Sequence, residues 1–384
     1  MKRIYFDYAA TTPVDPEVVK TMLPYFTEVF GNPSSLHYFG RQANNAIEKA
    51  RSDAADFIGA KPEEIIFTSG GTESDNFALK GIAFANSSKG KHIITSKIEH
   101  HGILESCQFL EENGFKVTYL PVQTNGILDP EEVKKAISSQ TILISVMHAN
   151  NEIGTIQQIR EIGKIARENK IYFHTDAVQS FGHIPINVDE MNIDMLSASA
   201  HKIYGPKGIG LLYLRKGTKI QPFLNGGSQE KKLRASTHNV PGIVGFGKAI
   251  ELASKNMQKE ASELTDLRDK LINGVLVNIE NTKLNGDSKQ RLPNNVNFSI
   301  KFVEGEGLVL GLDLEGIAVS SGSACTSGSL EPSHVLRAIG RTADLAHGSV
   351  RFSFGKFNNI EEVDYALEKL IKIVSRLRKM SPLC

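Results

Sequence analysis

Between residues 42 and 213 the chain alternates short apolar runs with segments whose apolar residues recur at helical spacing. A run that is apolar throughout is typical of a strand buried on both faces, and helices between such strands connect them in parallel. The alternation therefore predicts an α/β fold with a mainly parallel sheet covered by helices on both faces. The apolar runs are 64–69, 92–96, 116–122, 141–147, 171–175, 194–199 and 208–214, and the helical segments are 42–57, 73–86, 102–113, 130–138 and 157–169.

The pattern changes after about residue 255. A helical stripe of apolar residues precedes several strand-like segments, and a last amphipathic helix follows them. These segments predict a smaller α+β domain, and the chain length of 384 residues agrees with about two domains. The helical stripe covers 261–275, the strands 295–302, 317–320 and 349–354, and the last helix 363–377.

Charge and cysteine content exclude several classes of protein. The 44 Lys and Arg residues balance 43 Asp and Glu residues, so the net charge of +1 gives no electrostatic argument for a nucleic-acid partner. No apolar run reaches the ~18 residues of a membrane helix, and the N-terminus lacks the apolar core of a secretory signal. The three cysteines are odd in number and form no C-x-x-C pair, so we expect neither a disulfide framework nor a metal site. We expect a cytoplasmic protein.

Polar clusters follow the C-terminal ends of several predicted strands. In open α/β sheets ligands bind at that edge, so several clusters there predict a ligand site. The clusters are Ser69-Gly70-Gly71-Thr72, Glu99-His100-His101, His148 with Asn150-Asn151, Asp176 with Gln179, and Ser199-Ala200-His201-Lys202.

The glycine-containing turn at 69–73 joins a predicted strand to a predicted helix. Two glycines allow a tight turn, and the free N–H groups of a helix N-terminus bind anions such as phosphate. The spacing matches neither the dinucleotide-binding nor the P-loop motif. The alternative is an ordinary turn in which Thr72 caps the helix.

Lys202 and Asp176 each allow two interpretations. Lys202 is either a solvated residue at a strand end or a desolvated amine that forms a Schiff base. Asp176 is either a simple cap or the carboxylate that keeps a pyridinium nitrogen protonated. Together with the phosphate-binding turn, the two residues form the minimal set for pyridoxal phosphate.

Three further residue types carry chemistry in this sequence. His100 or His101 can stack on a cofactor ring or move protons, and a metal pair is disfavoured because adjacent residues of an extended segment point to opposite faces. Arg351, among apolar neighbours, is either half of a structural ion pair or a fork that binds a substrate carboxylate. Cys325 lies in a Ser- and Gly-rich segment at 320–333 that we interpret as a mobile loop.

The surroundings of the three cysteines differ. A thiol among Gly and Ser residues suits a nucleophile better than a buried structural position, so we expect Cys325 to be reactive. Cys107 lies on a helical segment and is expected in the core. Cys384 is the last residue and is expected to be frayed.

Taken together, the motifs resemble the cysteine desulfurases of the NifS/IscS-like group. That group belongs to the pyridoxal-phosphate enzymes of the aspartate-aminotransferase fold (fold type I) and to the class V aminotransferase family. The resemblance extends over nearly the whole chain. Its motifs are Tyr5-Phe6-Asp7-Tyr8-Ala9-Ala10-Thr11-Thr12-Pro13, Gly31-Asn32-Pro33-Ser34-Ser35, Thr68-Ser69-Gly70-Gly71-Thr72-Glu73-Ser74, Met147-His148-Ala149-Asn150-Asn151-Glu152-Ile153-Gly154, His201-Lys202-Ile203-Tyr204-Gly205-Pro206-Lys207-Gly208, the Cys325 segment and Leu336-Arg337-Ala338-Ile339-Gly340.

The resemblance implies a division into a large cofactor-binding domain, 15–256, and a small domain, 1–14 with 257–384, which carries the cysteine loop. Lys202 would hold pyridoxal phosphate as a Schiff base and move the Cα proton. The resemblance also assigns Asp176 to the pyridine nitrogen, Gln179 to the ring hydroxyl and His100 to stacking on the ring. The phosphate would be held by Gly71, Thr72, Ser199, His201 and, from the other subunit, Thr237.

The resemblance likewise implies the reaction. Asn151, which would also contact the cofactor, and Arg351 would fix the carboxylate of L-cysteine. Cys325 would attack the substrate sulfur, become a persulfide and leave L-alanine. The enzyme would be a homodimer that delivers sulfur to an acceptor or cluster scaffold protein, for iron–sulfur clusters or other products.

Two departures from the group and several alternatives remain. Ala200 replaces a glycine that many members have before His-Lys, and the chain ends at Cys384 where some members continue into a tail associated with scaffold docking. The resemblance therefore does not identify the acceptor. A selenocysteine lyase or an aminotransferase of the same fold are alternatives. A non-catalytic sulfur carrier, or a nucleotide-binding module without chemistry, is an alternative of another class. An aminotransferase has no use for a mobile thiol.

Overall fold

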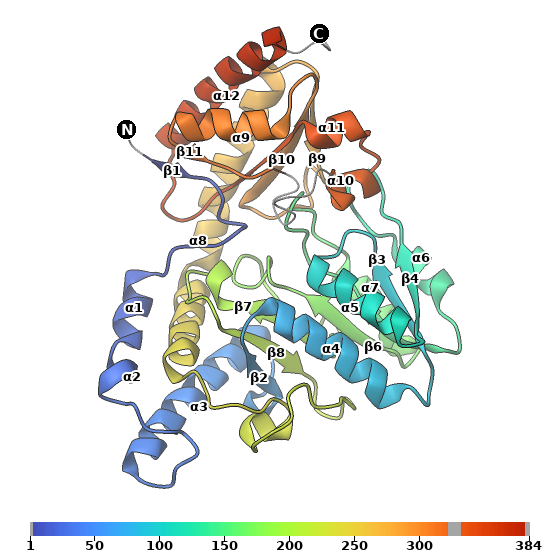
Figure 1. Ribbon diagram of the computed structural model, residues 1–384, viewed down its shortest axis with the longest axis vertical. Coiled ribbons are helices and arrows are strands. Elements are labelled where there is room, and N and C mark those ends of the chain that lie inside the picture. The colour runs from blue at the N-terminus through green and yellow to red at the C-terminus, as the bar shows by residue number, and fades with distance from the viewer. Residues whose placement is uncertain (1–2, 322–331, 381–384) are drawn as a thin grey trace.

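Two of the three β-sheets in the described ranges organise the chain, one at each end of the molecule (Figure 1). The computed structural model describes residues 3–321 and 332–380. One sheet has seven strands, and the other has three. The α/β fold class predicted from the sequence is confirmed, as is the separate α+β part toward the C-terminus.

The seven-stranded sheet has the order β2-β8-β7-β6-β5-β3-β4. Only β8 runs antiparallel to its neighbours β2 and β7, and the remaining pairs are parallel. The predicted mainly parallel sheet is thus correct. The strands are β2 (Ile65–Thr68), β3 (His92–Ser96), β4 (Lys116–Leu120), β5 (Thr141–Ser145), β6 (Tyr172–Asp176), β7 (Met195–Ser199) and β8 (Gly210–Leu214).

Helices cover both faces of this sheet because successive strand residues point to opposite sides. In β2, Ile65 and Phe67 join the core under α3, α7 and α8, whereas Ile66 joins the core under α4 and α5. Both cores consist of buried aliphatic and aromatic side chains, as apolar strand runs require. The helices of this part are α1 (Pro16–Met22), α2 (Pro24–Thr27), α3 (Tyr38–Ile58), α4 (Gly71–Asn86), α5 (His101–Glu112), α6 (Pro130–Ala136), α7 (Ile159–Glu168) and α8 (Val240–Asn278).

The three-stranded sheet has the antiparallel order β12-β10-β9. It packs with α9, α12 and the second half of α8 around a core of its own. The N-terminal strand β1 (Ile4–Tyr5) belongs to this end of the molecule, because it pairs in parallel with β11 (Ile317–Ala318). The other elements are β9 (Thr282–Asn285), β10 (Asn295–Ile300), α9 (Gly305–Leu314), α10 (His334–Ala338), α11 (Ala343–His347), β12 (Ser349–Ser353) and α12 (Ile360–Met380).

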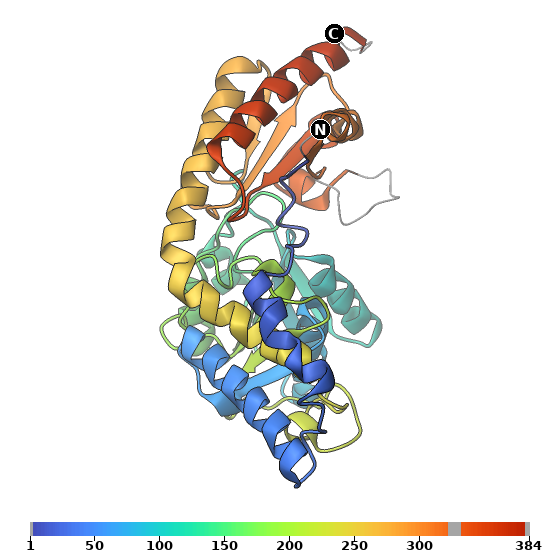
Figure 2. The same cartoon turned by 90° about the vertical axis from the view of Figure 1, so that its left-hand side faces the viewer.

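One helix, α8, runs from the core of the seven-stranded sheet to the core of the three-stranded sheet (Figure 2). Its 39 residues bury apolar side chains up to Ile250 and again from Leu264 onward, with no buried residue between them. The sequence-based domain boundary between residues 256 and 257 falls in this exposed middle part, within one continuous helix. The domain division itself stays a prediction. No helix in the described ranges, α8 included, is long and apolar enough to cross a membrane.

Candidate functional site

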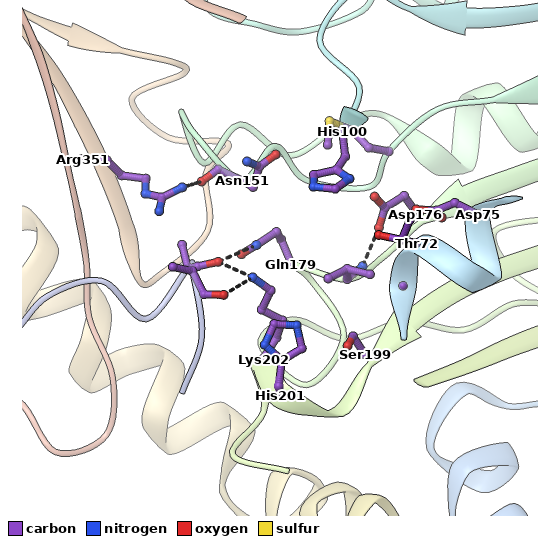
Figure 3. A pocket seen from close by; sticks show the side chains of 15 residues that line it. Thr72, Asp75, His100, Asn151, Asp176, Gln179, Ser199, His201, Lys202 and Arg351 are labelled. Carbon is purple, nitrogen blue, oxygen red and sulfur yellow. Dashed lines mark hydrogen bonds between the residues drawn. The ribbon is translucent and has the colours of Figure 1, made fainter. Parts of the chain in front are cut away.

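A cavity of about 280 Å³ opens at the C-terminal edge of the seven-stranded sheet (Figure 3). It brings together ten of the residues singled out in the sequence. They are Gly71, Thr72, His100, Asn151, Asp176, Gln179, Ser199, His201, Lys202 and Arg351. Arg351 and Asn151 lie at one end of the cavity, and Thr72 and Ser199 lie at the other. The remaining lining residues are Ala9, Ala10, Asp75, Met147 and Val178.

The start of α4 forms the anion-binding end of the cavity. The helix begins at Gly71, and its N-cap residue Gly70 makes no side-chain capping bond, so Thr72 lies in the first turn and is not the cap. A Cβ on Gly71 would lie 2.5 Å from Val178 Cγ2, so only glycine fits this close approach. The free N–H groups of the first turn and the hydroxyls of Thr72 and Ser199 therefore supply donors for a phosphate.

His201 lies beside this end of the cavity. Its Nδ1 is 3.1 Å from the hydroxyl oxygen of Thr11. Burial lowers the pKa of His201 to about 4, with Lys202 and Lys207 acting in the same direction. The imidazole is therefore neutral at pH 7 and acts as a hydrogen-bonding group.

Two buried carboxyl groups back the middle of the cavity. Asp176 ends β6, and its Oδ1 accepts a hydrogen bond from the backbone N–H of Val178 at 2.9 Å. Burial raises the pKa of Asp176, while His100 opposes the shift. Asp75, from α4, is also buried, and burial together with the charge of Asp176 raises its pKa well above the usual range. Asp75 Oδ1 has no hydrogen-bond partner among the described residues, although His174 Nε2 lies 3.7 Å away. Buried carboxylates of this kind favour a cation, and the protonated ring nitrogen of pyridoxal is one.

Lys202 projects into the cavity from a short 3₁₀ helix, Ala200–Lys202, that follows β7. The strand itself ends at Ser199, three residues earlier than the lysine. Lys202 Nζ donates to the carbonyl oxygens of Ala9 at 2.5 Å and Ala10 at 2.7 Å. Gln179 Nε2 donates to the same Ala9 oxygen at 3.0 Å, so one N-terminal segment orients both side chains (Figure 3).

His100 caps α5 and faces the cavity. Its Nδ1 accepts a hydrogen bond from the backbone N–H of Gly102 at 3.0 Å, which leaves Nε2 to carry the proton of the neutral ring. Burial lowers the pKa of His100, Asp176 opposes this shift and Lys202 adds to it. The adjacent His101 packs instead against His334, with ring centroids 4.9 Å apart.

Arg351, on β12, combines the two interpretations that its sequence context left open. Its side chain is 3% exposed, and Nη2 lies 2.8 Å from Asp7 Oδ1 in an ion pair. Nη1 donates to the carbonyl oxygen of Asn151 at 3.0 Å. Nε is buried without a hydrogen-bond partner in the described ranges, and the residue lines the cavity. Arg351 is thus both ion-paired and available to a ligand.

Two of the expected site residues are not among the described residues that line this cavity. Thr237 lies in a second cavity of about 210 Å³, together with Ser69 and Arg234. Cys325, in 322–331, and Cys384, in 381–384, lie outside the described residues. Cys107 is buried in α5, as expected for a core residue, and burial raises the pKa of its thiol.

The segment that carries Cys325 begins and ends beside the Arg351 end of the cavity. On one side, Ser320 exchanges two backbone hydrogen bonds with Arg351, at 2.7 and 3.2 Å. On the other, the Ser333 hydroxyl donates to Glu152 Oε2 at 2.5 Å. Burial raises the pKa of Glu152 to about 7. The flanks of this segment are therefore buried and hydrogen-bonded.

Sequence reasoning missed several residues that shape the cavity. Asp75 lies three residues after Thr72 on α4, and this helical spacing was a usable signal. Asp7 offered no local signal, because its partner Arg351 is 344 residues away. Ala9 and Ala10 contribute main-chain oxygens, which no side-chain pattern indicates.

Comparison with known families gives one match over most of the chain. Residues 4–366 match the model of the aminotransferase class-V family. A relative named cysteine desulfurase IscS from Dictyoglomus turgidum is 61% identical over 383 residues, which cover 100% of this chain and 97% of the relative. A relative of the same name from Methanosarcina thermophila is 59% identical, covering 100% of this chain and 94% of the relative.

Solved structures agree with the sequence comparison. A structure titled NifS-like protein superposes with a TM-score of 0.92 at 40% identity, covering 98% of this chain and 100% of its own. A second, titled SspA in complex with cysteine, has a TM-score of 0.83 at 41% identity and covers 93% of this chain and 100% of its own.

Proposed function

The chain belongs to the aminotransferase class-V family, and we propose that it is a pyridoxal-phosphate-dependent cysteine desulfurase. It converts L-cysteine to L-alanine and transfers the sulfur to Cys325 as a persulfide. The observation that carries this proposal is a single cavity that collects an anion-binding helix end, a buried carboxylate, a lysine and an arginine. Relatives covering the whole chain at up to 61% identity bear the name cysteine desulfurase.

The cavity residues fit pyridoxal phosphate. The start of α4 with Thr72 and Ser199 suits the phosphate, and the buried Asp176 suits the protonated ring nitrogen. Gln179 suits the ring hydroxyl, and the neutral His100 ring suits stacking on the cofactor. When bound, the cofactor withdraws electrons from the amino acid and so weakens its Cβ–S bond.

Lys202 has two tasks in this proposal. It holds the cofactor covalently, and it moves the proton at the substrate Cα. The Ala9 and Ala10 carbonyl oxygens orient its amine by hydrogen bonds. Proton transfer requires contact within hydrogen-bond reach, and Lys202 lines the same cavity as Asp176 and Arg351, which supports the assignment.

The other end of the cavity serves the substrate and the thiol. Arg351 and Asn151 bind the α-carboxylate of L-cysteine. The Cys325 thiolate attacks the substrate sulfur, an S–S bond forms, the substrate C–S bond breaks, and the carbon takes up a proton to give alanine. Ser320 and Ser333, which flank the segment of Cys325, both hydrogen-bond with residues at this end, and that supports its assignment.

The decisive experiment is incubation of the cofactor-loaded protein with L-cysteine. We expect alanine and, with a reductant, sulfide in equal amounts, and mass spectrometry should find one extra sulfur on the peptide of Cys325. The protein should be yellow and lose that colour with borohydride. Mercaptopyruvate formation with a 2-oxo acid would instead indicate an aminotransferase, and a colourless protein would indicate a sulfur carrier. Activity confined to selenocysteine would indicate a lyase for that substrate.

The proposal includes a homodimer with shared sites. Large apolar side chains on and between α1 and α3 are exposed, which is unusual unless a partner covers them. A strained segment with positive φ at Glu230, Lys231 and Lys232 shares a surface cavity with Ser34, between α2 and α3, and leads to Thr237. A second copy would cover the apolar side chains and receive Thr237 beside its cofactor phosphate. The exposed side chains are Leu23, Phe26, Phe30, Leu36, Tyr38 and Phe39.

Mixed dimers test this arrangement. A Lys202→Ala chain and a Thr237→Ala chain should each be weak or inactive alone. A mixed dimer of the two should regain up to about half of the wild-type activity, because one of its two sites then has Lys202 and Thr237 both intact. No recovery in mixtures shown by sedimentation to be dimeric would contradict the shared site. We also propose that the protein works in the cytoplasm and that a cluster scaffold protein accepts its sulfur.

A further inference from the structure

Asp7 is fixed to the strand that carries Arg351. It forms an isolated parallel bridge with Ser353 of β12, and its Oδ1 lies 2.8 Å from Arg351 Nη2. The Arg351 side chain is 3% exposed and the Asp7 side chain 21%. The ion pair is therefore largely removed from water, where charges act on each other more strongly than at a surface.

The guanidinium of Arg351 still has donors for a ligand. Of its five N–H groups, one on Nη1 serves the Asn151 carbonyl oxygen and one on Nη2 serves Asp7, which leaves three. One of these is on Nε, which is buried without a hydrogen-bond partner in the described ranges. A carboxylate that enters the cavity can thus bind Arg351 while Asp7 remains paired with it.

We propose that Asp7 sets the affinity of the site for the α-carboxylate of an amino acid by competing for Arg351. This inference rests on the proposed function and deepens it. A carboxylate bound to the same guanidinium lies close to Asp7, and like charges within about 4–6 Å disfavour each other. Asp7 therefore weakens the binding of substrate and product while holding Arg351 in place.

The weakening matters most for the product. L-Alanine keeps the α-carboxylate and the amine of L-cysteine, and it must leave before the next turnover. Without the charge of Asp7, a buried and uncompensated guanidinium would hold alanine more tightly. Uniformly tighter binding of substrate and product does not raise the rate of the chemical step.

The test uses Asp7→Asn, which keeps an oxygen acceptor for Arg351 and removes the charge. Calorimetric titration of L-alanine into the cofactor-loaded protein gives its Kd, and steady-state kinetics give KM for L-cysteine. We expect Kd to fall about fivefold or more and KM to fall with it, while kcat does not rise. A purely structural role for Asp7 predicts the opposite sign, with both constants raised.

Three controls define the effect. L-Alaninamide, which lacks the carboxylate, should not bind more tightly to Asp7→Asn. Asp364→Asn removes an exposed carboxylate that pairs with Lys270 far from the cavity and should change nothing. In the background of Arg351→Gln, the effect of Asp7→Asn on Kd should vanish.

Several outcomes overturn the inference or separate it from the proposed function. An unchanged or higher Kd of L-alanine in folded Asp7→Asn overturns it, and so does an equal gain for L-alaninamide. Should circular dichroism show that Asp7→Asn is unfolded, Asp7→Ser undergoes the same titration with the same criterion. Failure of the wild-type protein to make alanine from L-cysteine contradicts the proposed function instead, while the alanine titration still tests Asp7.

Discussion

The two ends of the cavity are built in different ways. At the end formed by the seven-stranded sheet, Asp176 and His100 are each oriented by a backbone N–H two residues away, that of Val178 and that of Gly102. Lys202 and Gln179 at this end also bond to the Ala9 carbonyl oxygen of the N-terminal segment. At the other end, Arg351 depends on Asp7 and Asn151, which are 344 and 200 residues away. The sheet end thus takes its side chains from the strand termini of one sheet, with the N-terminal segment as an added contact, whereas the Arg351 contacts at the carboxylate end all join distant parts of the chain. We expect changes at the sheet end to abolish chemistry and changes at the carboxylate end to alter binding or sulfur transfer.

The largest effect is expected at the sheet end, from Lys202→Ala. Loss of the amine removes both the covalent hold on the cofactor and the proton transfer at Cα. Alanine formation should fall by at least about 10³-fold. Borohydride reduction followed by mass spectrometry should no longer attach the cofactor to the chain. Normal alanine production by this variant would remove Lys202 from the mechanism.

The next effect separates cofactor chemistry from sulfur transfer. Cys325→Ala should still bind the cofactor and change its absorbance on addition of L-cysteine, because the cavity residues are intact. Alanine formation should nevertheless fall by at least about 10³-fold, since loss of a nucleophile can cost up to about 10⁶ in kcat. Cys107→Ala is the matched control, since that thiol is buried in α5 and should not be needed for activity. A Cys325→Ala enzyme that keeps its activity would contradict the mechanism.

A moderate effect is expected at the carboxylate end, from Arg351→Lys. An ammonium cannot make the two parallel bonds of a guanidinium, and each charge-assisted bond contributes roughly 1.5–3 kcal/mol. KM for L-cysteine should therefore rise at least about tenfold, with a smaller change in kcat. An unchanged KM would show that the carboxylate binds elsewhere.

The smallest effect is expected in the pH dependence of folding stability, through a buried glutamate next to His100. Burial raises the pKa of Glu99, next to His100, to about 8. Between the usual glutamate pKa and that value, the folded protein keeps a proton that the unfolded chain has released, so stability falls as pH rises through this window. Glu99→Gln cannot titrate, and its melting temperature should change less between pH 5.5 and 8 than that of the wild type. The exposed Glu105→Gln should follow the wild-type profile.

The fold was predictable where a local pattern determined it. The strand at 92–96 matches β3 because an apolar run ends in polar residues on both sides. The antiparallel direction of β8 was also open to prediction, since the ten residues between Ser199 and Gly210 are too few for a parallel crossover. By contrast, β9 has only one apolar residue, Leu284, and its pairing with β10 depends on buried Asn285.

The candidate site was predictable to the extent that its residues follow strands. Asp176, Lys202 and the turn before α4 all lie at strand ends of one sheet edge, which the sequence pattern indicates. The contact between Asp7 and Arg351 depends on how β1 reaches the small sheet, and no local pattern carries that information. The long-range half of the site therefore required the structure.

The pairing of β1 with β11 also has a consequence for synthesis on the ribosome. Ile4 pairs with Ile317, and the 312 residues between these positions must be translated before the partner strand exists. At roughly 5–20 residues per second, the first strand waits about 15–60 s in an unpaired state. The seven-stranded sheet is complete in sequence at Leu214 and can fold earlier, so the nascent chain carries a finished sheet and an exposed apolar N-terminus together. We expect chaperones that bind short apolar segments to contact that N-terminus until β11 emerges.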